Sequence, residues 1–224
     1  MSVAPEAWSG FADPVLDAQS VFRTIMTAMA RPGTIADLAG DGLRPPRPLT
    51  RALAAVALTL CDHETPIWLD ADLAAGAAVA RYVQFYTGAP LVADPCDAAF
   101  AFAVDLSVLP PLASFAQGSD EYPDRSTTLV LAVEALGSGH ALSLAGPGIE
   151  ERAMFTFTPL TKNPAAEVDR MAFFESFIGE LIDNHGSFPR GVDCIFAATG
   201  KVAALPRSTR ITIDRAEAPQ TRGA

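Results

Sequence analysis

The sequence predicts a single α/β domain in which helices flank a mixed β-sheet. Its 224 residues, of which 50% are hydrophobic, suit one domain with a substantial core. Segments with apolar residues at helical spacing alternate with short apolar runs bounded by glycine or proline, and a hairpin pattern follows. This succession is typical of a mixed sheet covered by helices. We expect the domain to span residues 13–213, with an N-terminal tether at 1–12 and a flexible tail at 214–224.

A first helix is predicted to begin at Asp13-Pro14, because aspartate accepts hydrogen bonds from first-turn N–H groups and proline is tolerated there. Arg31-Pro32-Gly33 is a strong stop signal for the same helix. The residues expected to form its apolar face are Leu16, Phe22, Ile25, Met26 and Met29.

Two more helices and three short strands are expected next. An apolar stripe from Leu53 to Leu60 predicts a helix that runs to Cys61, and a third helix is predicted over about 71–87, closed by Gly88. Short apolar runs predict strands at 67–69, 91–92 and 99–104.

The second half is predicted to contain a hairpin, a long helix and a final group of strands. Residues 106–125 are rich in proline, glycine and serine and indicate a loop with one short helix. Strands at 127–135 and 141–144 flank Gly137-Ser138-Gly139, which predicts a hairpin turn. The remaining predicted elements are an amphipathic helix at 167–185 and strands at 192–197, 202–205 and 211–213.

Charge and cysteine usage exclude several classes of function. The net charge of −10 disfavours nucleic acid and anionic membranes as partners, although a small phosphorylated ligand needs only a local cluster of donors. Three widely spaced cysteines give neither a metal pattern nor a disulfide framework. We see no signal peptide and no apolar run of membrane-spanning length, and we expect a cytoplasmic protein.

The segment Cys61–Thr65 concentrates reactive side chains at a helix-to-strand junction. A nucleophile with a nearby base is one interpretation. Adjacent side chains seldom point into one site, however, and Cys61 ends an apolar stripe, so a buried, inert cysteine is the alternative that we favour.

Three other segments could bind an anion. Gly146-Pro147-Gly148 lacks the phosphate-loop pattern and precedes two glutamates, which favours a sharp turn. The run 207–210 offers two guanidinium groups, but in a strand they would lie on opposite faces, and we favour a solvated edge strand there. The polar loop 120–127 precedes the strongest predicted strand, and loops at strand ends often bind ligands, but we favour a plain surface loop. Without assigning a catalytic residue or a metal ligand, we take as ligand or interface candidates Asp17, Arg23, Asp62, Thr65, Arg125, Arg207 and Thr209.

Five motifs follow one another along the chain: GFADPVLDAQSVFRTIMTAMARPG at 10–33, LTLCDHETPIWL at 58–69, FYTGAPLV at 85–92, STTLVLAV at 126–133 with GPGIEE at 146–151, and FPRGVDCIFAATGKVAALPRSTRI at 188–211. In this order they resemble the H subunit of bacterial carbon–phosphorus lyase. Each motif is weak alone, but together they extend over most of the chain. Cys61 and His63 occupy positions that the family pattern leaves open.

The resemblance implies a subunit of a phosphonate-degrading complex with the G, I and J subunits. With the G, I and L subunits it implies a part in forming ribose 1-phosphonate 5-triphosphate, as an alkylphosphonate displaces adenine from ATP. The family fold resembles a reduced pyridoxal-phosphate-dependent transferase that lacks the cofactor. Neither Lys162 nor Lys201 lies in a Schiff-base context, so we expect no cofactor. We expect a mainly structural or co-catalytic role, and a homodimer when the protein is isolated.

Two alternatives remain open. One is a free-standing transferase that uses the Asp62–Thr65 junction together with Arg207 and Thr209. The other is a stand-alone module that binds a nucleotide or a phosphonate.

Overall fold

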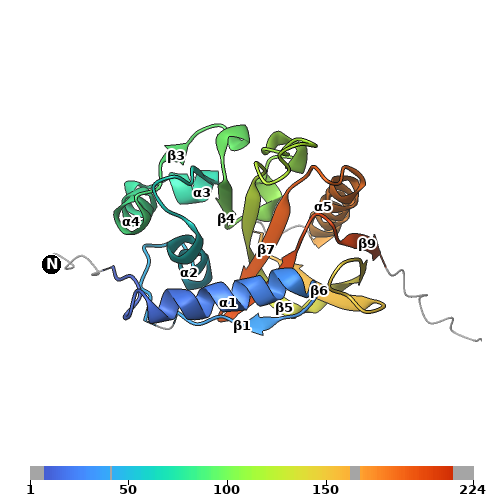
Figure 1. Cartoon of the computed structure of the whole chain (residues 1–224), viewed down its shortest axis with the longest axis horizontal. Helices are drawn as coiled ribbons and strands as arrows, with labels where there is room; N and C mark the ends of the chain where they lie inside the picture. The colour runs from blue at the N-terminus through green and yellow to red at the C-terminus, as the bar shows by residue number, and fades with distance from the viewer. Residues whose placement is uncertain (1–7, 41, 162–166, 214–224) are drawn as a thin grey trace, which may run out of the picture.

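The computed structural model describes residues 8–40, 42–161 and 167–213 (Figure 1). Within these residues nine strands form one mixed sheet, in the order β1-β8-β7-β5-β4-β2-β3, with β6 and β9 pairing with β5. The helices are α1 (Leu16–Ala30), α2 (Arg51–Leu60), α3 (Ala71–Ala74), α4 (Ala77–Thr87) and α5 (Glu167–Gly186), with 3-10 turns η1 (Pro95–Asp97), η2 (Leu106–Val108) and η3 (Leu112–Ser114). The strands are β1 (Ala36–Asp37), β2 (Ile67–Leu69), β3 (Leu91–Val92), β4 (Phe100–Ala103), β5 (Thr128–Ala145), β6 (Ala153–Pro159), β7 (Asp193–Ala198), β8 (Lys201–Leu205) and β9 (Arg210–Ile213). The predicted α/β class with a mixed sheet flanked by helices is confirmed.

The centre of the sheet is parallel. Strand β2 pairs in parallel with β3 and β4, and β5 pairs in parallel with β4 and β7. Antiparallel strands extend this centre, since β8 pairs with β7 and β1 pairs with β8. The parallel strands therefore bring their carboxyl ends to one edge of the sheet.

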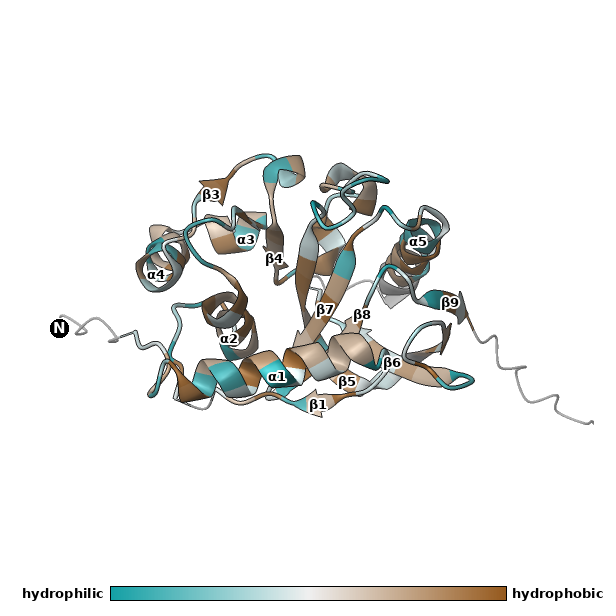
Figure 2. Cartoon of the chain, viewed as in Figure 1, coloured by the Kyte–Doolittle hydropathy of each residue, from teal (hydrophilic) through white to brown (hydrophobic). Residues whose placement is uncertain are grey.

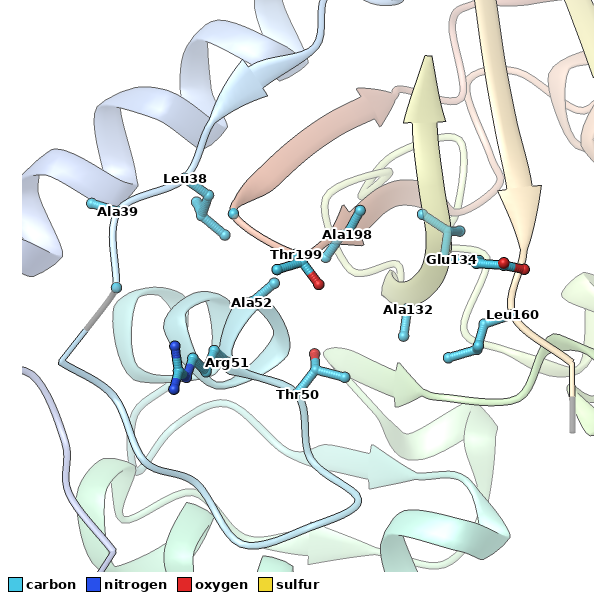
Figure 3. Close-up of a pocket in the computed structure, with 14 residues that line it drawn as sticks. Leu38, Ala39, Thr50, Arg51, Ala52, Ala132, Glu134, Leu160, Ala198 and Thr199 are labelled. Atoms are coloured by element: carbon cyan, nitrogen blue, oxygen red, sulfur yellow. The ribbon is translucent and has the colours of Figure 1, made fainter. Parts of the chain in front are cut away.

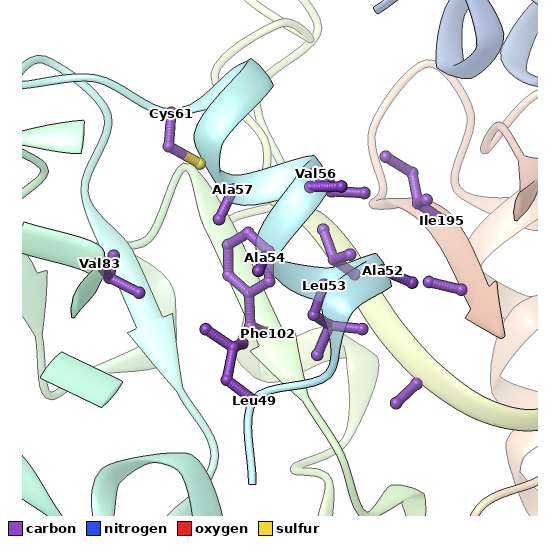
Figure 4. Packing of buried hydrophobic residues seen from close by; sticks show 14 of the residues in the cluster. Leu49, Ala52, Leu53, Ala54, Val56, Ala57, Cys61, Val83, Phe102 and Ile195 are labelled. Carbon is purple, nitrogen blue, oxygen red and sulfur yellow. The ribbon is translucent and has the colours of Figure 1, made fainter. Parts of the chain in front are cut away.

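The two faces of β5 contribute to two hydrophobic cores, because successive strand residues point to opposite faces. Val130 and Ala132 belong to the core shared with α1, α2 and α4, whereas Leu129 and Leu131 belong to the core shared with α5. The central strands are mostly apolar (brown in Figure 2). Figure 4 shows how closely α2 packs on the first face, beside Phe102 of β4.

Helix α1 begins at Leu16, slightly later than predicted, but Asp13 binds its first N–H groups as expected. The Asp13 carboxylate accepts hydrogen bonds from the backbone N–H groups of Val15 and Leu16, at 3.0 and 2.9 Å. In return the Asp17 carboxylate accepts the backbone N–H of Asp13 at 3.0 Å. The helix ends before Gly33, whose φ of 87° is accessible to glycine at little cost.

The predicted apolar face of α1 is partly wrong. Ile25 is buried as expected, with Val21 and Ala28, but Leu16, Phe22 and Met26 are 64%, 46% and 41% exposed. Two adjacent apolar stripes run along the helix, and the smaller residues pack inward, where α1 approaches α2 and β8. The larger side chains are left on the surface.

The predicted third helix is two helices. A break at Ala75-Gly76 separates α3 from α4, which ends at Gly88 with a φ of 72° as expected. Asp70 caps α3 by accepting the N–H of Leu73 at 2.8 Å.

The predicted hairpin at 137–139 is wrong, because β5 continues through this segment as one strand of 18 residues. Leu136 and His140 both stand opposite Phe157 of β6, so the residues between them form an irregular bulge. Gly137 and Gly139 have φ values of 85° and 99° and supply the bulge instead of a turn. The true partner, β6, lies beyond Gly146–Gly148 and was missed.

The other elements agree with expectation, with small shifts in their ends. Strands β7, β8 and β9 and helix α5 lie where predicted, and the loop 106–125 contains η2 and η3 instead of one helix. Part of the expected tether is described: Ser9 pairs with Arg44, and the Tyr82 hydroxyl donates to the Ser9 carbonyl oxygen. The expected tail at 214–224 lies outside the described residues. Among the described helices, none combines the length and the apolar character that crossing a bilayer requires.

Candidate functional site

A cavity of about 490 Å³ lies at the carboxyl end of β7 and of the part of β5 that pairs with it in parallel. We call it the β5–β7 cavity (Figure 3). Its lining comes from the loop Leu38–Gly40, the start of α2 at Thr50–Ala52, the β5 residues Ala132–Glu134, Leu160, and the β7–β8 turn at Ala197–Gly200. Ligands of open α/β sheets usually bind beyond the carboxyl ends of the strands.

The cavity exists because two neighbouring strands separate. β5 and β7 are in register up to Ala132 opposite Ala197. Beyond this point β7 turns into β8, whereas β5 continues alongside β6. Glu134 has no partner in the β5–β6 register, so a bulge falls on the residue that lines the cavity.

The start of α2 forms one wall. Thr50 is its N-cap, and the Thr50 hydroxyl oxygen accepts the N–H of Leu53 at 3.2 Å. The first N–H groups of any α-helix lack acceptors within the helix, so those of Arg51 and Ala52 remain as donors. The first turn of α2 contains no acidic residue, and the exposed Arg51 begins it.

The rim of the cavity is held by backbone hydrogen bonding. The Leu38 N–H donates to the Gly200 carbonyl oxygen at 2.9 Å, which joins the 38–40 loop to the β7–β8 turn. Most lining residues are small or apolar, and the polar side chains among them are those of Thr50, Arg51, Glu134 and Thr199. Such a hollow, apolar with a few polar groups, is the usual character of a small-molecule site.

Asp17 and Arg23 lie on α1, away from the cavity lining. Asp17 completes the N-terminal cap described above, and Arg23 is exposed. Asp17 therefore has a structural role as a capping group, and Arg23 is a surface residue outside the cavity.

The Asp62–Thr65 junction is a turn whose polar groups satisfy one another. The Asp62 N–H donates to the Thr65 hydroxyl oxygen at 2.6 Å, and that hydroxyl donates to the Asp62 carbonyl oxygen at 2.8 Å. Burial, with a smaller contribution from Asp62, raises the pKa of Cys61 to about 12. A thiol with this pKa is protonated at neutral pH, so Cys61 is a poor nucleophile.

Arg207 is paired inside the protein. Its Nε and Nη2 donate to the two carboxylate oxygens of Asp193 at 3.1 and 2.5 Å, and its Nη1 donates to the Pro123 carbonyl oxygen at 2.6 Å. The Arg207 and Asp193 side chains are 12% and 16% exposed. The expectation of a solvated edge strand is therefore wrong for Arg207.

Arg125 lies two residues after Pro123, and Thr209 lies two residues after Arg207, but their surroundings differ. The Arg125 guanidinium lies 4.3 Å from the centre of the Tyr122 ring. Thr209 is 2% exposed, and its hydroxyl has no hydrogen-bond partner among the described residues. The structure thus brings the 120–127 loop and Arg207 together through Pro123, at the amino ends of β5 and β7 and opposite the cavity.

None of the seven candidates from the sequence lines the β5–β7 cavity. The residues that do, Thr50, Arg51, Glu134 and Thr199, were missed. One signal was present, because a threonine before an apolar helical stripe is a typical N-cap.

Gly146–Gly148 is the sharp turn that the sequence favoured. It joins β5 to β6, and no helix follows it. A Cβ atom at Gly148 would lie 2.1 Å from the Ala30 carbonyl oxygen, so the turn packs directly on the end of α1. Among the described residues no three His, Cys, Asp or Glu side chains are placed to hold a metal ion. Lys162 lies outside the described residues, and the expectation of no pyridoxal cofactor stays a prediction.

The matches to known proteins extend over nearly the whole chain. A family model described as bacterial phosphonate metabolism protein (PhnH) matches residues 9–212. A Rhizobium meliloti (strain 1021) protein named alpha-D-ribose 1-methylphosphonate 5-triphosphate synthase subunit PhnH is 41% identical over 212 residues, which are 94% of this chain and 98% of the relative. A Stutzerimonas stutzeri protein named as a candidate C-P lyase subunit protein, HtxG, is 29% identical over 195 residues, covering 87% of this chain and 86% of its own.

Proposed function

Because the chain belongs to the PhnH family of bacterial phosphonate metabolism proteins, we propose that it is a subunit of a ribose 1-methylphosphonate 5-triphosphate synthase. The observation that carries the proposal is the 41% identity to a relative of that name over nearly the whole of both chains. The reaction that we assign to the complex is the displacement of adenine from ATP by an alkylphosphonate.

The proposed role is assembly and support of catalysis within the complex. We propose the G, I and J subunits as direct partners, with a functional link to the L subunit, and a homodimer when the protein is isolated. The proposed site of action is the cytoplasm. We retain as proposals the likeness to a reduced pyridoxal-phosphate transferase fold and the domain limits 13–213.

Exposed apolar side chains support a role in assembly. On α1 these are Leu16, Phe22 and Met26, and on α4 Phe85 is 81% exposed. Contiguous exposed apolar patches often mark contacts with a partner protein, and we infer that these side chains contribute to one. Both relatives are named as subunits, which agrees with this interpretation.

The state of the candidate reactive groups supports dependence on other subunits. Cys61 is protonated at neutral pH, Arg207 is paired with Asp193, and Asp62 and Thr65 bond to each other. A free-standing transferase built from these groups is therefore the weaker alternative.

Growth on a phosphonate tests the proposal. A phosphonate-degrading strain lacking this gene should fail to grow on methylphosphonate as sole phosphorus source and should still grow on phosphate. The wild-type gene should restore growth. Unimpaired growth of the deletion strain on methylphosphonate would rule the proposed function out.

A stand-alone binding module is a second candidate, and the β5–β7 cavity is the observation that favours it. The purified protein alone should then bind its ligand with unchanged affinity whether or not the other subunits are present.

A further inference from the structure

We propose that the β5–β7 cavity binds a small organic phosphate or phosphonate, with its phosphorus oxyanion at the start of α2 and its carbon body on the apolar floor. This inference deepens the proposed function and rests on it for one choice, that of a phosphorus oxyanion over a carboxylate.

The size and the rigidity of the cavity suit a small molecule. Its volume of about 490 Å³ falls within the range of roughly 300–1,000 Å³ typical of ligand pockets. Its rim is fixed by the Leu38–Gly200 hydrogen bond and its floor by the Ala132–Ala197 register. A preformed pocket loses little conformational entropy when a ligand binds.

One wall of the cavity favours an anion. Thr50–Ala52, at the start of α2, line this wall, so the first-turn N–H groups of the helix and the partial positive charge of its N-terminus lie beside the cavity. Arg51, on that turn, is the sole cationic residue among the described residues that line the cavity. A guanidinium can form two parallel hydrogen bonds to one phosphate or phosphonate group.

The apolar floor of the cavity favours a ligand that has a carbon body as well as an anionic group. Leu38, Ala132, Ala197 and Ala198 give it an apolar surface of small side chains. An inorganic ion would lose water to this surface without gaining hydrogen bonds from it. A ligand with a carbon chain or ring would bury apolar atoms there instead.

Glu134 places a carboxylate on the side of the cavity opposite Arg51. Figure 3 shows Arg51 and Glu134 on opposite sides of the cavity, and the bulge in β5 falls on Glu134. An ionised carboxylate only accepts hydrogen bonds, so it selects a hydroxyl or amino group and repels a second anion. The expected ligand therefore has one anionic end and a hydrogen-bond donor at the other end.

Calorimetric titration of the purified full-length protein tests the site. The probes are ribose 5-phosphate, 2-hydroxyethylphosphonate and inorganic phosphate. We expect one of the two organic probes to bind at one site per chain, at least about tenfold more tightly than inorganic phosphate. Binding of the sugar phosphate alone assigns the site to phosphate esters, and binding of the phosphonate alone assigns it to phosphonates.

Three variants connect the binding to the cavity. Arg51→Gln should weaken binding about tenfold, and the matched control Arg81→Gln, an exposed arginine of α4 outside the lining, should leave it unchanged. Ala132→Leu should abolish binding by filling the floor. If circular dichroism shows that Ala132→Leu does not fold, the effect of Arg51→Gln alone tests whether the ligand binds in the cavity. Absence of binding by either organic probe, or binding that Arg51→Gln does not weaken, overturns the proposal.

The same proteins separate this inference from the proposed function. A chain that binds no probe but restores growth on methylphosphonate removes the ligand site and leaves the subunit role intact. A chain that binds at Arg51 but whose loss does not affect growth removes the subunit role and leaves the site intact.

Discussion

Arg207 and Asp193 form a two-point ion pair beneath the 120–127 loop, with Nη2 2.5 Å from Oδ2 and Nε 3.1 Å from Oδ1. The same Asp193 oxygen accepts the backbone N–H of Arg207 at 2.8 Å. Asp193 begins β7, and Arg207 lies in the turn after β8, so the pair fastens that turn to the start of the parallel strand. Through Pro123 it also holds the loop.

Asp193→Ala should destabilise the protein, because it leaves a largely buried guanidinium without its partner. Breaking such a pair from one side costs about 3–5 kcal/mol when it is fully buried, and we expect about 2–4 kcal/mol here. The free energy of unfolding, measured by urea denaturation, checks this value. The control is Asp120→Ala, whose exposed pair with Arg190 at 3.5 Å should contribute less than about 1 kcal/mol. Equal effects of the two substitutions would contradict the account.

Asp70 joins two elements through one buried carboxylate. It accepts N–H groups from Leu73 at 2.8 Å, Val104 at 2.7 Å and Asp105 at 3.2 Å. Asp70→Ala should lower the free energy of unfolding by about 2–4 kcal/mol, because three buried donors lose their acceptor. Asp94→Ala, which removes an exposed cap of η1, should have a much smaller effect than Asp70→Ala in the same urea titration.

The three cysteines should differ in reactivity. Cys96 is exposed, whereas Cys61 and Cys194 are buried, and burial raises the pKa of both buried thiols. A thiol reagent should therefore modify one cysteine per native chain and three in denaturant. Mass spectrometry after brief alkylation identifies the site, and rapid native modification of Cys61 would refute the burial seen here.

The reaction of Cys96 should also depend on pH in a particular direction. A hydrogen bond to the Asp94 carboxylate favours the protonated thiol and raises its pKa. The thiolate fraction at pH 8 is then smaller than that of a free cysteine, and it grows as pH rises through the raised pKa. Asp94→Asn should increase the alkylation rate at pH 8, and an unchanged or lower rate would contradict this cause.

Two glycines should respond oppositely to alanine. At Gly148, with a φ of 80°, a Cβ would lie 2.1 Å from the Ala30 carbonyl oxygen, so Gly148→Ala should cost more than about 2 kcal/mol. At Gly179, inside α5, a Cβ meets nothing within 4 Å, and Gly179→Ala should add about 0.5–1 kcal/mol. Thermal unfolding of the two variants beside the wild type measures both signs.

Local patterns in the sequence predicted much of the fold. Asp13 and Gly88 mark helix ends through short-range chemistry, and that chemistry is present in the structure. Gly137 and Gly139 led to the wrong prediction of a hairpin turn, because glycine adopts a positive φ equally well in a hairpin turn and in a bulge. Only the pairing of β5 with the distant β6 decides between these two uses.

The candidate site was less accessible to prediction. The residues that line the β5–β7 cavity lie as far apart in the chain as Leu38 and Gly200. They meet because β5 and β7 separate after Ala132 and Ala197. No local pattern encodes that separation. Arg207 was chosen for its donors, but its distant partner, Asp193, determines what it does.

The α1 surface should contribute to assembly rather than to folding. Phe22→Ser and Met26→Ser replace side chains that are 46% and 41% exposed, so each should change the free energy of unfolding by less than about 0.5 kcal/mol. If this surface contacts a partner, the double variant should recover less of the other subunits in co-purification. The matched control is Val108→Ser, an exposed apolar residue of η2, which should recover them fully.

Affinity purification from phosphate-starved cells, followed by mass spectrometry, tests the subunit role most directly. The tagged wild-type chain should recover the G, I and J subunits in stable proportion. Recovery of the tagged chain alone, from cells shown to contain those subunits, would contradict the account.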